Sequence, residues 1–128
     1  MEIIAAVFMD DISMRDVPGP STRIDLIGIQ FSAAAPEPVP VTIAPHLVVI
    51  VRCAPGDAET AALEVRYLMN GEQVARNLQP LQVEPGKFSY RLVRGELDFD
   101  DYTTVEAHCR IDGGHTVVVP FTLLPPAD

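Results

Sequence analysis

Four acidic residues gather between positions 96 and 101 and form the most site-like group in the chain. They are Glu96, Asp98, Asp100 and Asp101. Calcium takes six to eight oxygen ligands, often from loops at one end of a β-protein, so carboxylates would suit it. The spacing matches no EF-hand loop, and the interleaved Leu97, Phe99 and Tyr102 are typical of side chains that anchor a loop to a core. We expect a solvated acidic loop, with a calcium or small-ligand site as the alternative.

The chain contains no recognisable catalytic motif. It has no nucleophile elbow, no glycine-rich phosphate loop, and no CxxC or HExxH sequence. His46, His108 and His115 are scattered, and a zinc site built from His46, His108 and a carboxylate would lack four ligands at recognisable spacing. We therefore predict a protein that is not an enzyme and has no cofactor. An active site assembled from distant residues would leave no motif, so activity is kept as a third hypothesis.

Apolar residues on the strand phase that a β-sandwich normally leaves wet are the most informative feature. They are Val48, Ile50, Val118, Ile4 and Phe8. Single exposed apolar residues are normal, whereas a contiguous apolar patch marks an interface. Three covers are open: the proline-bearing connector at 32–45, a second copy of the chain, or another protein. The pattern predicts an interface on these residues for another protein chain or for self-association.

The elements that must position these residues begin with a β-hairpin at 103–123. With Asp112-Gly113-Gly114 as its turn, the register pairs Cys109 with Val117, Ala107 with Val119, Val105 with Phe121 and Thr103 with Leu123. This register puts nearly every apolar residue on one side, because strand side chains alternate between faces. His108 and Val118 fall on the other side.

A second hairpin joins strands 62–69 and 72–79 through Asn70-Gly71, the strongest two-residue hairpin signal. Its register sets Tyr67 opposite Val74, Leu63 opposite Leu78 and Val65 opposite Arg76. An arginine at an inward position stops an edge strand from recruiting another sheet. We therefore predict that 72–79 is an edge strand.

The remaining strands are predicted at 2–9, 22–31, 46–53 and 88–94. In the last of these, Phe88, Tyr90 and Leu92 share a phase. The apolar phase of 22–31 switches at Gly28, which indicates a bulge, a bend or a strand buried on both faces. About eight strands separated by turn signals, with no helical periodicity, predict a single domain over 1–128: an all-β, two-sheet antiparallel β-sandwich.

Composition excludes several classes of protein. The hydrophobic fraction of 48% excludes disorder, and no apolar run approaches the ~20 residues of a membrane helix. The net charge is 9 − 18 = −9 with a single lysine, which argues against nucleic acid and against an anionic membrane as partners. The N-terminus carries an acid at position 2 and lacks a basic start, so we expect no secretory signal and a cytoplasmic location. Cys53 and Cys109 are expected to be buried free thiols, unless their strands face each other.

The order of elements resembles a family of small bacterial proteins known only as a domain of unknown function. The segments that carry the resemblance are EIIAAVFMDD, IDLIGIQF, HLVVIVR, LEVRYLMNGEQV, EPGKFSYRLV and the closing VVVPFTLLP. The resemblance implies a sandwich of immunoglobulin-like proportions and carries over no catalytic or binding residue. Together with the apolar patch, it leads us to expect a non-enzymatic interaction or assembly module.

Overall fold

The computed structural model describes residues 1–127, which form eleven strands and no helix. The strands are β1 (Glu2–Met14), β2 (Ile24–Gln30), β3 (Ser32–Ala34), β4 (Val41–Ile43), β5 (His46–Arg52), β6 (Thr60–Met69), β7 (Glu72–Gln82), β8 (Phe88–Arg94), β9 (Leu97–Phe99), β10 (Thr104–Ile111) and β11 (Val117–Leu124). The all-β prediction is confirmed. The prediction of about eight strands in two sheets is wrong, because the strands form sheets of four, five and two.

The strands that the prediction missed are three-residue segments. β3 and β4 lie within the proline-bearing connector, and β9 lies within the acidic segment. β3 pairs in parallel with β11, while β4 and β9 pair with each other as a small antiparallel sheet. Three residues are too few to show an alternating pattern, so these strands leave no periodic signal in the sequence.

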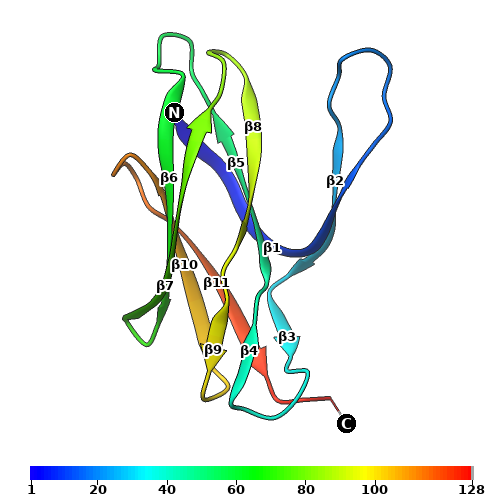
Figure 1. Cartoon of the computed structure of the whole chain (residues 1–128), viewed down its shortest axis with the longest axis vertical. Helices are drawn as coiled ribbons and strands as arrows, with labels where there is room; N and C mark the ends of the chain where they lie inside the picture. The colour runs from blue at the N-terminus through cyan, green and yellow to red at the C-terminus, as the bar shows by residue number, and fades with distance from the viewer. Residues whose placement is uncertain (128) are drawn as a thin grey trace.

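The two larger sheets pack face to face around the core (Figure 1). One sheet, called sheet A here, has the order β2-β1-β5-β8, and the other, sheet B, has the order β3-β11-β10-β6-β7. Phe8 from β1 meets Phe121 from β11 between the sheets, with ring centroids 5.3 Å apart. Burial of such side chains from both sheets is the main force that holds the layers together.

The hairpin of β10 and β11 has the predicted register. Cys109 pairs with Val117, Ala107 with Val119 and Val105 with Phe121. Asp112 and Gly113 both have positive φ, as the tight turn requires. The pairing of β10 with β6 on its other side then places this hairpin near the centre of sheet B.

The hairpin of β6 and β7 differs from its predicted register by one residue. Asn70 and Gly71 have the positive φ of a type I′ turn, but an extra residue of β7 at Val74 shifts the pairing beyond Leu68. Tyr67 therefore pairs with Ala75, and Arg76 pairs with Arg66 and is exposed rather than inward. β7 is an outer strand of sheet B, as predicted.

β1 is long enough to belong to two different parts of the molecule. Residues 2–7 pair only with β5, Phe8 and Met9 pair with both β5 and β2, and the part beyond Asp10 pairs only with β2. Gly28 has φ +66° beside the Asp10 carboxylate, where a Cβ would collide with that side chain. Residues 11–27, here called the β1–β2 arm, bend away at this point and run alongside β8 (Figure 1). The predicted irregularity at Gly28 is therefore this bend.

Candidate functional site

The five residues predicted to form an exposed patch do not share a surface. Phe8 is fully buried between the sheets, and Val48 is fully buried but outside that core. Ile4 is exposed near the start of β1, and Val118 is exposed on β11 of the opposite sheet. Ile50 is half-buried on β5. The predicted interface is corrected accordingly, because Val48 and Phe8 are not available to a partner.

The chain's own β1–β2 arm approaches the face of β5 that carries Ile50. The Tyr90 hydroxyl on β8 lies 3.6 Å from Sδ of Met14 at the end of β1. Ile24 of β2 and Ile50 of β5 line the same cleft between the arm and sheet A. None of the three covers considered from the sequence was this one. β5 does carry apolar side chains on its outer face, and part of this face is covered by the same chain.

The arm leaves a cleft of about 490 Å³ between itself and the outer face of β5 and β8. Its lining residues are Thr22, Ile24, Ile50, Gly86, Lys87, Phe88, Ser89 and Tyr90. Phe88 is 71% exposed, and Met14, at the end of β1 in the arm, is 59% exposed. The cleft is thus an apolar surface that the fold covers only in part.

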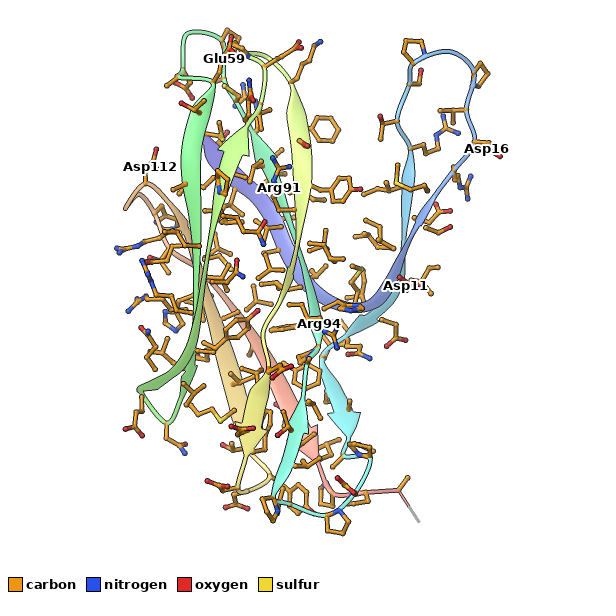
Figure 2. The ribbon with its side chains drawn as sticks, in the orientation of Figure 1. Asp11, Asp16, Glu59, Arg91, Arg94 and Asp112 are labelled. Atoms are coloured by element: carbon orange, nitrogen blue, oxygen red, sulfur yellow. The ribbon has the colours of Figure 1, made fainter. Side chains whose placement is uncertain are left out.

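Side chains of β8 and of the arm point toward one another across this space (Figure 2). Asp11 at the bend and Asp16 near the tip of the arm point away from β8 in the same view. The lining contains no His, Cys, Asp or Glu, so these residues offer no metal ligand set. Their chemistry is suited to holding apolar side chains.

Sequence reasoning missed Ile24, Phe88 and Tyr90 as members of a site. Tyr90 pairs with Ile50, so both lie on the face of sheet A that the arm approaches. The shared phase of Phe88, Tyr90 and Leu92 and the phase switch at Gly28 were visible in the sequence. Only the bend in the structure shows that the apolar side chains of β8 and those of the arm line the same cleft.

Half of the acidic segment 96–101 is strand β9, which is fixed to the core by its apolar side chains. Leu97 and Phe99 are buried, which confirms their predicted role as anchors. Asp98 accepts a hydrogen bond from Oγ1 of Thr42 at 2.5 Å, and Oδ1 of Asp101 accepts one from the Tyr102 amide at 2.8 Å. Within residues 1–127, no three His, Cys, Asp or Glu side chains converge on a metal-binding arrangement. Glu96, Asp98, Asp100 and Asp101 are therefore not brought together as a ligand set.

Three arginines surround one carboxylate on the outer face of sheet B, a cluster that the sequence did not reveal. Arg76 and Arg110 contact Glu64 at 2.7 and 2.8 Å, and Arg66 lies 3.8 Å from it. Hydrogen bonds from Arg76 and Arg110 lower the pKa of Glu64 below its ordinary value. The residues come from β6, β7 and β10, so the cluster ties three neighbouring strands together.

Both cysteines are free and buried, as predicted. Burial raises the pKa of the Cys109 thiol to about 12, which makes it a poor nucleophile at neutral pH. The histidines also have local partners: Nδ1 of His46 lies 2.9 Å from the Asp10 carbonyl oxygen, and Nε2 of His108 lies 3.3 Å from Glu106. His46 and His108 lie on different sheets, so they do not form the zinc pair considered from the sequence.

Comparison with known proteins gives no relative to guide the assignment. No protein-family model matches this chain, and no curated protein matches it significantly. Residues 1–127 include no helix with the length and apolar character needed to cross a bilayer. The function is therefore argued from the cleft itself.

Proposed function

We propose that this protein is a non-enzymatic interaction module that binds an apolar, extended segment of a partner protein in the cleft beneath the β1–β2 arm. The observation that carries the proposal is the exposed apolar lining: Phe88 retains 71% of its accessible surface although Ile50 and Tyr90 beside it are half-buried. Burying a side chain such as Phe88 stabilises a complex by about 1.5–3 kcal/mol. In the fold of the single chain, most of the Phe88 side chain stays in contact with water.

A protein segment suits the cleft better than a small molecule does. Small-molecule sites typically bury more than about 70% of their ligand's surface. Here Phe88 and Met14 stand open to solvent at the two sides, so a compact ligand would remain substantially wet. A chain segment lying between the arm and β8 would instead cover both side chains and continue beyond the cleft.

The charge distribution supports the same class of partner. The chain carries a net charge of −9, and Asp11 and Asp16 of the arm point away from the cleft (Figure 2). Such a surface repels nucleic acid and anionic lipid, which both need clustered cations. We also propose a cytoplasmic location, supported by two cysteines that stay unpaired.

The proposal is tested with two matched variants used as bait in lysate of the source organism. Ile50→Glu puts a charge into the cleft, whereas Val118→Glu puts the same charge on exposed β11 of the other sheet. We expect a discrete protein to bind the wild-type and Val118→Glu baits and to be lost with Ile50→Glu. The captured protein is then purified, and its Kd should rise at least ~10-fold for Ile50→Glu alone. Identical captures with all three baits would contradict the proposal.

A further inference from the structure

The free edge of β2 is the least protected sheet edge in the described part of the chain. β2 ends sheet A and pairs with β1 on one side only, so its other side presents unpaired backbone N–H and C=O groups. The other outer strands are blunted. β3 has only three residues, β7 contains Pro80 and a bulge, and Gln79 of β7 donates to the Leu92 carbonyl of β8 at 3.4 Å. β2 has seven residues and contains no Lys, Arg or Pro, and its one irregular position is Gly28, with φ +66°.

The exposed side chains along this edge are apolar. Ile27 and Ile29 are 49% and 48% exposed, and Phe31 just beyond the strand is 80% exposed. Natural edge strands usually carry charges that prevent pairing with another chain. The one charge of β2, Asp25, is already engaged by Arg15, whose Nε lies 2.6 Å from Oδ2. A largely apolar edge of this length, whose one charge is paired, is suited to receiving another strand.

We propose that the strand that pairs with this edge is β2 of a second copy, so that two chains form one continuous eight-stranded sheet about a two-fold axis at Ile27. The Arg15 amide donates to the Arg23 carbonyl at 2.9 Å, so residues 23, 25, 27 and 29 direct their backbone groups toward β1. Ile24, Leu26 and Gln30 then direct theirs outward. An axis at Ile27 pairs Ile24 with Gln30 of the second copy. The outward backbone N–H and C=O groups of one chain then face those of the other.

The side chains of β2 are complementary to themselves in this register. Ile27 meets its own copy, Asp25 lies opposite Ile29, and Arg23 lies opposite Phe31, where a guanidinium can stack on the aromatic face. No like charges stand opposite each other. The two Asp25 carboxylates are four residues out of register, or about 14 Å, which exceeds the Debye length of ~8 Å at physiological salt. The Asp25 pair is therefore no obstacle at this edge.

This inference goes beyond the proposed partner-binding cleft, because it concerns the outer edge of β2 rather than the space between the arm and β8. The wild-type mass is measured by sedimentation velocity from about 5 to 500 µM, the range in which a small interface associates. We expect the mass to rise from 13.9 kDa toward twice that value. Ile27→Lys places two cations against each other at the axis and should raise the dimer Kd at least ~10-fold. Val118→Lys, which carries the same charge on the other sheet, should leave it unchanged.

Cross-linking reports the register independently of stability. Ile27→Cys brings two thiols together across the axis at a spacing that a disulfide spans, whereas Ile29→Cys leaves them about 14 Å apart. Oxidation should therefore link Ile27→Cys into a covalent dimer and leave Ile29→Cys monomeric. A wild-type chain that stays monomeric throughout, or equal cross-linking of both variants, would overturn the inference. Ile50→Glu should dimerise normally while losing its cleft partner, so failure of either proposal is recognised separately.

Discussion

Tyr90 and Met14 lie 76 positions apart in the chain, yet the tyrosine hydroxyl reaches the methionine sulfur at 3.6 Å. The contact joins the end of β1 to the middle of β8, across a face of sheet A that otherwise carries Ile50 without a complete cover. The arm therefore acts as a partial lid over an apolar surface. Val48 has no exposed surface whereas Phe88 is open, and this difference defines where another chain would bind.

Val48→Asp should strongly destabilise the fold. Val48 has no exposed surface, and an unpaired carboxylate there would lose its hydration without gaining a partner. We expect the free energy of unfolding in urea to fall by at least ~3 kcal/mol. Val118→Asp, at an exposed site on β11, should change it by no more than ~0.5 kcal/mol. Similar, small losses for both variants would show that Val48 is not sealed from solvent.

Strand registers could be predicted where side chains alternate regularly from a recognisable turn. They could not be predicted where an extra residue interrupts the alternation. The β10–β11 register followed from the Asp112-Gly113 turn because every residue from Val105 to Cys109 alternates regularly. The β6–β7 register failed because one extra residue at Val74, which no pattern marks, shifts all pairs beyond it.

The site was only half predictable for a different reason. An outward apolar residue such as Ile50 looks the same in sequence whether its cover is a partner or a distant part of the same chain. The bend at Gly28 places the arm beside Ile50, and the direction of a bend has no signature in an amino-acid pattern. β9 contains only one of the four acidic residues, Asp98, which lies between the buried Leu97 and Phe99 and accepts a hydrogen bond from Thr42.

Gly95→Ala should destabilise the fold by crowding a buried ring. A Cβ at Gly95 would lie 2.8 Å from Cε2 of Tyr67, whose ring is fully buried. Overpacking of this kind costs about 1–3 kcal/mol. The loss is measured by urea unfolding. In a Tyr67→Leu background the same Gly95→Ala change should cost less, and an equal cost in both backgrounds would mean that the ring is not the obstacle.

Glu64→Gln should lower the free energy of unfolding relative to the wild type at neutral pH. The difference between the two proteins should shrink at acidic pH. The hydrogen bonds from Arg76 and Arg110 lower the pKa of Glu64 from its ordinary value of 4.5, so the carboxylate favours the folded state. This contribution is complete above pH 4.5 and is lost as the pH falls through the lower pKa of the folded protein. Urea unfolding at several pH values should show the two proteins converging in acid. Parallel curves would indicate that the carboxylate does not titrate with folding.

Cys109 should resist alkylation in the native protein. Burial raises the pKa of its thiol to about 12, so almost no thiolate exists at pH 8. We expect mass spectrometry after iodoacetamide treatment to find Cys109 unmodified until denaturant is added. Rapid native labelling at Cys109 would show that the space between the sheets opens to solvent.

The most direct test of the account places a photoreactive phenylalanine analogue at position 88, in the cleft, and separately at position 118 on the other sheet. Irradiation in cells of the source organism should link position 88 to one discrete protein through an apolar segment, identified by mass spectrometry. Position 118 should give no such adduct. If position 88 yields no adduct, or the same adducts as position 118, the cleft beneath the β1–β2 arm is not a protein-binding site.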